Sequence, residues 1–151
     1  MSILNPENLG RKSEQREIVV DHSQLKLFAK AIAESNPIYF DQEAAIAAGH
    51  PDILALPTFG NCLNFLAPAK ELTYESLGID YKKLLHTEEH IELLLNIYAG
   101  DRLTLITEVS DLYEKKDGAI QFLVMTTNIH RDARLVQKVR TTVMMKQEAA
   151  R

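Results

Sequence analysis

The segment Pro57-Thr-Phe-Gly-Asn-Cys-Leu-Asn-Phe-Leu-Ala-Pro-Ala-Lys70 decides how this chain folds. Proline suits the first turn of a helix, so the sequence predicts a helix that begins at Pro57 and runs to about Lys70. Its apolar residues lie on more than one face, and they are Phe59, Cys62, Leu63, Phe65, Leu66 and Ala67. A helix that is apolar on several faces is buried rather than laid on a surface. We therefore predict that this helix is the centre of the fold and that Phe65 belongs to the core.

Beyond this helix the apolar residues change from the helical period to the alternating period of strands. Asp117-Gly118 is a strong signal for a hairpin turn between two of these strands. The clearest alternation sets Ile120, Phe122, Val124 and Thr126 against Gln121, Leu123, Met125 and Thr127. Alternation of this kind suits an antiparallel sheet with one packed face. The predicted strands are 84–98, 102–113, 119–130 and 135–146.

The residues before the central helix carry capping signals for two shorter helices. Asp21 offers an N-cap for the first helix. The apolar residues at helical spacing after it are Leu25, Phe28, Ala29 and Ile32. Asn36-Pro37 is expected to stop this helix, because proline disfavours helical geometry in the residue before it. Asp41 caps a second predicted helix at 43–48, and Gly49 ends it.

Helices followed by a run of strands indicate the α+β class, in one domain that spans residues 1–151. Residues 1–13 read as a lead-in segment, and 15–20 as a short first strand. The sheet needs an apolar cover for its inner face, and the helix at 57–70 is the best candidate. A curved antiparallel sheet wrapped around a long central helix is the hot-dog fold, which we therefore expect.

Composition excludes several classes of protein. The formal net charge of −4 argues against nucleic acid as the main partner, because phosphate binding needs a basic surface. No apolar run approaches the roughly 20 residues that a membrane-spanning helix needs. Met1–Glu17 is polar, so no signal peptide is expected. Cys62 is the only cysteine and cannot form an internal disulfide, which favours a cytoplasmic location.

Three stretches of the sequence resemble a known enzyme family. They are Phe28-Ala-Lys-Ala-Ile-Ala-Glu-Ser-Asn-Pro-Ile-Tyr-Phe-Asp41, Leu56-Pro-Thr-Phe-Gly60, and Leu85-His-Thr-Glu-Glu-His-Ile-Glu-Leu93 followed by Ala99-Gly-Asp101. Together they resemble the MaoC-like dehydratases and (R)-specific enoyl-CoA hydratases, over residues 15–146. The third stretch is similar to the N-terminal half of the two-part enzymes of this family, in which each half is one hot-dog. The resemblance implies an acyl-CoA or acyl-carrier-protein thioester as ligand and no cofactor.

The sequence departs from this family at the positions that carry catalysis. In the family an Asp and a His form the catalytic dyad, and a His-Gly pair points a backbone N–H at the thioester oxygen. The matching positions hold Glu34, Tyr39 and Leu54-Ala55 here. The resemblance thus places Glu34 and Tyr39 at the catalytic positions, both substituted. The positions that it implies for substrate binding are Asn36, Leu54, Ala55, Pro57 and Thr58.

The chemistry of hydration makes these substitutions costly. Adding water to an unsaturated thioester needs a base, an acid and a group that stabilises enolate charge. Tyrosine, with a pKa of about 10, is a poor base at neutral pH. The extra methylene of Glu34 displaces the carboxylate by roughly 1 Å, which is enough to reduce catalysis. A structural interpretation is also open for both residues. Glu34 can be a carboxylate at the end of a helix, and Tyr39 can be a packed side chain whose hydroxyl is bonded to the backbone.

Three functions follow from this pattern. We expect this chain to be a subunit of an enoyl-thioester hydratase or 3-hydroxyacyl-thioester dehydratase. It would be the half that lacks the full dyad and would pair with a dyad-bearing hot-dog. An active homodimeric hydratase that uses Glu34 and Tyr39 is one alternative, and a non-catalytic acyl-CoA-binding module is another. A thioesterase is less expected, because the resemblance lies in the hydratase signature.

The remaining candidate residues favour structural interpretations. His86-Thr-Glu-Glu-His90 matches a zinc-protease pattern, but that pattern works only on a helix, and this run leads into a strand, so no metal site is expected. Cys62 lies among apolar residues and is interpreted as a small core residue. Arg131, Arg134 and Lys138 could contact coenzyme A phosphates, although a plain exposed basic edge is the simpler interpretation.

Overall fold

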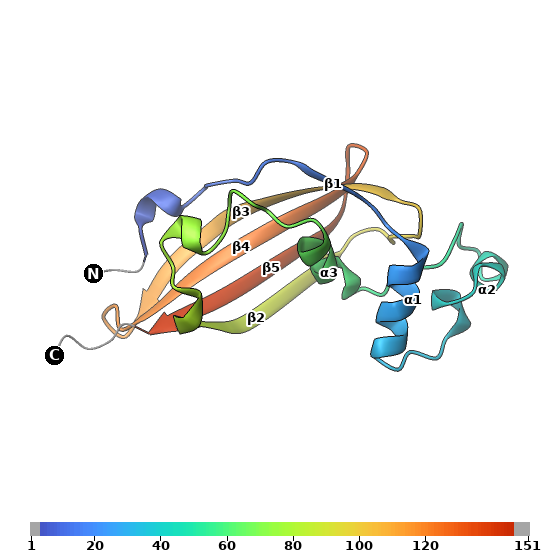
Figure 1. Cartoon of the computed structure of the whole chain (residues 1–151), viewed down its shortest axis with the longest axis horizontal. Coiled ribbons are helices and arrows are strands. Elements are labelled where there is room, and N and C mark those ends of the chain that lie inside the picture. The colour runs from blue at the N-terminus through green and yellow to red at the C-terminus, as the bar shows by residue number, and fades with distance from the viewer. Residues whose placement is uncertain (1–3, 147–151) are drawn as a thin grey trace.

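Three long strands joined by tight turns dominate the computed structural model, which describes residues 4–146. They are β3 (Arg102–Lys115), β4 (Ile120–Arg131) and β5 (Arg134–Lys146), and the first hairpin turns at Asp117-Gly118 as the sequence predicts. β1 (Arg16–Val19) pairs with β3, and β2 (Leu84–Leu93) pairs with β5. The result is one antiparallel sheet in the order β1-β3-β4-β5-β2 (Figure 1).

The helices occupy two places around this sheet, and the α+β class is confirmed. α3 (Phe59–Leu66) lies over one face of the sheet, whereas α1 (His22–Ala31) and α2 (Gln42–Ala47) lie beyond one end of the long strands (Figure 1). Within residues 4–146, none of the helices combines the length and hydrophobicity needed to cross a bilayer. Short 3-10 helices lie at Pro6–Asn8, Pro37–Tyr39, Glu75–Leu77 and Tyr81–Lys83.

α3 is shorter than the predicted helix at 57–70. It begins at Phe59 and ends at Leu66, because Ala67 precedes Pro68 and adopts a non-helical conformation. Burial follows one face only: Phe59 and Leu63 are four residues apart and both buried, whereas Phe65 is 79% exposed. The prediction that Phe65 belongs to the core is therefore wrong for the single chain, since an apolar pattern on several faces does not say which faces are covered.

α3 approaches the sheet most closely where it crosses β5. A Cβ atom built on Gly60 would lie 1.7 Å from Oε1 of Gln137, so a larger residue there would displace the Gln137 side chain. The Gln137 side chain is 1% exposed, and its Nε2 donates a hydrogen bond of 2.6 Å to the carbonyl oxygen of Pro57. The first turn of α3 is thus held against β5 by the close approach at Gly60 and by the hydrogen bond from the buried Gln137 amide.

The buried core consists of two apolar clusters separated by a band of threonines on the inner face of the sheet. On each long strand one threonine lies between members of the two clusters: Thr107 on β3, Thr127 on β4 and Thr141 on β5. The first cluster lies beneath α3 and includes Phe59, Leu63, Leu105, Ile129 and Val139. The second cluster includes Leu72, Leu77, Ile79, Leu123 and Val143.

β2 ends earlier than the predicted strand at 84–98. The backbone N–H groups of Leu94 and Leu95 both donate to the carbonyl oxygen of Val136, at 2.9 and 3.0 Å, so the regular ladder stops at Leu93. The chain then leaves β5, and residues 97–99 pair with 53–55 instead. This short pairing ties the loop before α3 to the end of the sheet.

The two aromatic residues of α3 should respond differently to truncation. We expect Phe59→Ala to lower the free energy of unfolding by about 3–5 kcal/mol, as for a core aromatic, because Phe59 is 2% exposed. Phe65→Ala should cost less than about 1 kcal/mol in the isolated chain. Denaturant melts of both variants at low protein concentration measure the difference, and equal losses would contradict this placement of α3.

Candidate functional site

The carboxylate of Glu34 stabilises the loop that follows α1. Ala33 adopts a left-handed backbone with φ of 58°, and the N–H of Glu34 donates to the carbonyl oxygen of Ala29 at 3.0 Å, which ends the helix before Asn36-Pro37 is reached. Oε1 of Glu34 then accepts hydrogen bonds from the N–H groups of Ser35 and Asn36, both at 2.8 Å. Two of the lone pairs that a base would use are thereby occupied by the backbone.

The segment that carries Tyr39 forms a separate short turn. The Asn36 side chain accepts a hydrogen bond from the N–H of Ile38 at 3.2 Å and so begins the 3-10 helix Pro37–Tyr39. Tyr39 is half-buried, and within the described residues no hydrogen bond joins it to Glu34. The structure thus brings the two substituted dyad positions to neighbouring turns without coupling them.

The backbone at Leu54-Ala55 is fully engaged within the fold. The N–H of Leu54 donates to the carbonyl oxygen of Ile38 at 3.3 Å, so this loop lies beside the turn that carries Tyr39. The N–H of Ala55, which the sequence resemblance predicts as the donor to the thioester, donates to the carbonyl oxygen of Ile97 at 2.8 Å. Pro57 and Thr58 are exposed, and the Thr58 side chain forms no capping hydrogen bond.

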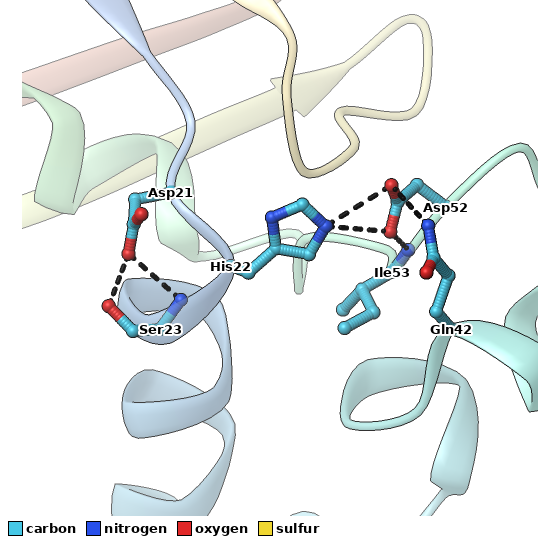
Figure 2. Close-up of polar contacts among 6 residues, drawn as sticks. All are labelled: Asp21, His22, Ser23, Gln42, Asp52 and Ile53. Carbon is cyan, nitrogen blue, oxygen red and sulfur yellow. Dashed lines mark hydrogen bonds and ion pairs between the residues drawn. The ribbon is translucent and has the colours of Figure 1, made fainter.

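Asp52 clamps this loop to the first turns of two helices, as Figure 2 shows. Its carboxylate accepts from Nε2 of His22 at 3.0 and 3.2 Å and from Nε2 of Gln42 at 3.0 Å. It also accepts from the N–H of Ile53 at 2.6 Å. His22 opens α1 beside its cap Asp21, so the clamp connects α1, α2 and the loop 51–57. The sequence alone gave His22 no role.

A cavity of about 410 Å³ lies elsewhere, between α3, the segment 67–83 that connects α3 to β2, and the inner face of the sheet. None of the residues that the sequence singled out as site residues lines it. The apolar part of the wall includes Phe65, Leu72, Tyr74, Tyr81, Leu84, Met125 and Val143. The polar part includes Arg16, Asn61, Asn64, His86, Glu89, Thr107, Thr127 and Thr141.

A chain of hydrogen bonds crosses the wall of this cavity. Arg16 donates to the hydroxyl oxygen of Thr107 and to the carbonyl oxygen of Ala67. The hydroxyls of Thr107 and Thr127 are 2.8 Å apart, and the Thr127 hydroxyl donates to Oδ1 of Asn64 at 3.1 Å. Burial lowers the pKa of the Arg16 guanidinium from its ordinary value, and the nearby carboxylate of Glu71 raises it. The alternation of residues on β3 and β4 contained a signal for this chain, namely threonines at positions that face the core.

The opposite wall holds a histidine and a glutamate from β2. This run is a strand, as the sequence predicts, and a register shift between His86 and Glu88 brings His86 and Glu89 to the same face. Nε2 of His86 lies 2.9 Å from Oε2 of Glu89. Within residues 4–146, no group of three or more histidine, cysteine and acidic side chains is placed to hold a metal ion.

Cys62 packs against the first apolar cluster from α3. Burial raises the pKa of its thiol above the ordinary value, so the thiol is protonated at neutral pH. This placement agrees with its interpretation as a small core residue. Arg131 is also engaged within the fold, because it forms an ion pair of 2.7 Å with Asp101.

Comparison with known proteins identifies the family. A model of the FAS1-like dehydratase domain region matches residues 7–139. A UPF0336 protein of Streptomyces coelicolor is 37% identical over 90 residues, a match that covers 60% of this chain and only 60% of the length of that relative. A UPF0336 protein of Clavibacter michiganensis subsp. michiganensis is 34% identical over 113 residues, which cover 72% of this chain and 76% of that relative.

Solved structures show the same fold at lower sequence identity. A complex named HadBC (3R-hydroxyacyl-ACP dehydratase) from Mycobacterium tuberculosis contains a chain with a TM-score of 0.78 and 21% identity, over 93% of this chain and 99% of that chain. The ChsH1–ChsH2 complex from the same organism gives a TM-score of 0.75 and 21% identity, over 91% and 90%. A MaoC-like dehydratase gives a TM-score of 0.80 and 24% identity, over 93% of this chain and 42% of that chain. The predicted fold is confirmed: this chain belongs to the family of the FAS1-like dehydratase domain region and has the hot-dog fold of the MaoC-like dehydratases.

Proposed function

We propose that this chain is the subunit of an enoyl-thioester hydratase or 3-hydroxyacyl-thioester dehydratase that lacks the catalytic dyad. The observation that carries the proposal is that the three substituted elements do not form a coupled catalytic group. Glu34 accepts hydrogen bonds from two backbone N–H groups, Tyr39 is uncoupled from it, and the N–H of Ala55 is bonded to Ile97. A carboxylate bonded to its own backbone, a tyrosine uncoupled from it and an oxyanion donor that is already bonded are a poor set for hydration, which supports assigning the chemical step to a partner.

The role left to this chain is to shape the acyl site and to complete the dimer. Its cavity of about 410 Å³ falls within the usual range for small-molecule sites, and its apolar wall suits the hydrocarbon part of an acyl thioester. The complexes to which the chain is similar include one whose name describes a 3R-hydroxyacyl-ACP dehydratase. We propose coenzyme A or acyl carrier protein as the thioester carrier, and a dyad-bearing hot-dog as the partner.

The partner surface that we propose is the open edge of β2. β2 pairs with β5 on one side only, so alternate residues of this ten-residue strand present unpaired backbone groups at the sheet edge. Large apolar side chains are exposed on or beside this strand and on the neighbouring α3. They are Phe65, Leu66, Tyr81, Leu85, Leu93 and Leu94. A second hot-dog that continued the sheet here would cover them.

The charge of β2 favours a partner of different sequence. The strand carries Glu88, Glu89 and Glu92 and no lysine or arginine. On its outer face Glu88 and Glu92 are balanced only by exposed ion pairs of 3.9 and 3.7 Å with Arg140 and Lys138 of β5. Pairing with a second copy would bring two acidic strands together, and like charges opposite each other destabilise a sheet. A neutral or basic edge strand fits better.

The catalytic assignment is tested with two matched variants in the presence and absence of a dyad-bearing hot-dog. We expect the lone chain to hydrate crotonyl-CoA slowly or not at all, and the partner to restore activity. Glu34→Gln keeps an oxygen for the two backbone N–H groups, so kcat of the complex should stay within a few-fold, and Tyr39→Phe should behave likewise. A loss of about 100- to 10,000-fold would show a general acid–base group and contradict the proposal.

Analytical ultracentrifugation tests the partner surface. We expect the isolated chain to self-associate at micromolar concentration rather than remain a monomer, because the β2 edge is open. The double change Glu88→Gln and Glu92→Gln should tighten self-association roughly 3- to 30-fold at low salt, and high salt should narrow the difference. Glu43→Gln, on α2 and away from β2, is the control. A wild-type chain that stays a fully folded monomer both alone and in the presence of a dyad-bearing hot-dog would contradict the proposed partner surface.

A further inference from the structure

His86 and Glu89 form a hydrogen-bonded pair in the wall of the cavity. The carboxylate of Glu89 can only accept, so Nε2 of His86, which lies 2.9 Å from Oε2, carries the hydrogen of this bond. Nδ1 is therefore the ring nitrogen that holds the lone pair of the neutral imidazole, and no residue within 4–146 is hydrogen-bonded to it. An imidazole that a carboxylate orients through one nitrogen is equipped to take a proton at the other.

The surroundings of the pair favour His86 as the base of the cavity. The His86 side chain is half-exposed, so water reaches it, whereas Oε1 of Glu89 is buried and no described residue donates to it. The charge of Glu89 is thus available to stabilise the imidazolium that forms when His86 takes a proton. Tyr74 lines the same cavity, but burial, with contributions from Tyr81 and Glu89, raises the pKa of its phenol, so Tyr74 stays protonated.

Hydrogen-bond donors line the cavity from α3 and β1. They are the side-chain amides of Asn61 and Asn64 and Nε of Arg16. Nε of Arg16 is buried, and no described residue accepts from it. Oδ1 of Asn64 accepts from Thr127, which leaves the NH2 group of Asn64 as a donor. Donors of this kind, taken together, stabilise the charge that develops on a carbonyl oxygen when its carbon is attacked.

A single base opposite a group of donors meets the needs of thioester hydrolysis better than those of hydration. Hydration needs a base for water and also an acid that protonates the α-carbon. Hydrolysis needs one base, which takes a proton from water and returns it to the leaving thiolate, and donors for the oxyanion. His86 and the donors of α3 and β1 supply this second set.

We propose that this chain hydrolyses an acyl thioester in its own cavity, with His86 as general base and Glu89 as a positioning residue. His86 takes a proton from water while the water oxygen bonds to the thioester carbon, and the carbonyl electron pair moves onto its oxygen beside the donors. Collapse of this intermediate breaks the C–S bond, and the thiolate takes the proton from the imidazolium, which yields a carboxylic acid and a free thiol. The inference rests on the proposed function, because it assumes that an acyl thioester enters this cavity.

Release of free coenzyme A from octanoyl-CoA, followed by liquid chromatography, tests the activity of the lone chain. We expect the wild-type chain to release it at least about 100-fold faster than His86→Asn purified in the same way, as for the loss of a general base. Glu89→Gln should lower kcat at least about 10-fold and leave KM within a few-fold, because it removes orientation of the base rather than binding.

Three controls separate catalysis from folding. His130→Asn is the matched variant, because His130 lies on β4 and does not line the cavity, and it should keep the wild-type rate. In His86→Ala, added imidazole should restore part of the lost rate, which a structural defect would not allow. Thermal melts show whether each variant folds.

A non-hydrolysable octyl-CoA thioether, titrated by calorimetry, separates the inference from the proposed function. If the thioether binds but the wild-type chain releases coenzyme A no faster than His86→Asn, the inference is wrong and the proposed acyl site stands. An unchanged kcat in Glu89→Gln would contradict the role of the pair. If the thioether binds neither the lone chain nor its complex with a dyad-bearing hot-dog, both the inference and the proposed acyl site are wrong.

Discussion

The position of α3 on β5 is the constraint on which the rest of the structure depends. Residue 60 has no side chain, so the helix backbone can lie against the buried amide of Gln137, which in turn holds the carbonyl of Pro57. With the first turn fixed there, Phe59 and Leu63 cover one half of the sheet. The other half of the inner face is left to the segment 67–83, and the cavity lies between α3, this segment and the sheet.

The residues at the positions expected to serve catalysis and substrate binding stabilise the local backbone here. Glu34, Asn36, Leu54 and Ala55 each satisfy a backbone group of a neighbouring turn or loop. Asp52 holds the same loop from the other side through His22 and Gln42 (Figure 2). Hydrogen bonds from both side chains and backbone groups thus stabilise the turns at 33–39 and the loop 51–57. Such a region suits a subunit that presents a stable surface to a catalytic partner.

Local sequence signals predict most of the fold but little of the candidate site. The strand period, the Asp117-Gly118 turn and the caps Asp21 and Asp41 act over a few residues, and the structure confirms each of them. The extent and burial of α3 depend on Pro68 and on which face meets the sheet, which an apolar pattern does not specify. The hydrogen-bond chain joins β1, β3, β4 and α3, so its members meet only after the sheet has formed.

The division of the core into two clusters has a consequence for local dynamics. The segment 67–83 is anchored by the buried side chains of Leu72, Leu77 and Ile79 and by side-chain bonds from Asn8, Arg11 and Arg16, without joining the sheet as a strand. Such a segment can open as a cooperative unit at a lower free energy than global unfolding, and its amides then exchange with solvent sooner than those of β3 and β4. Because it forms one wall of the cavity, its opening would admit a long ligand while the first cluster and the sheet stay intact.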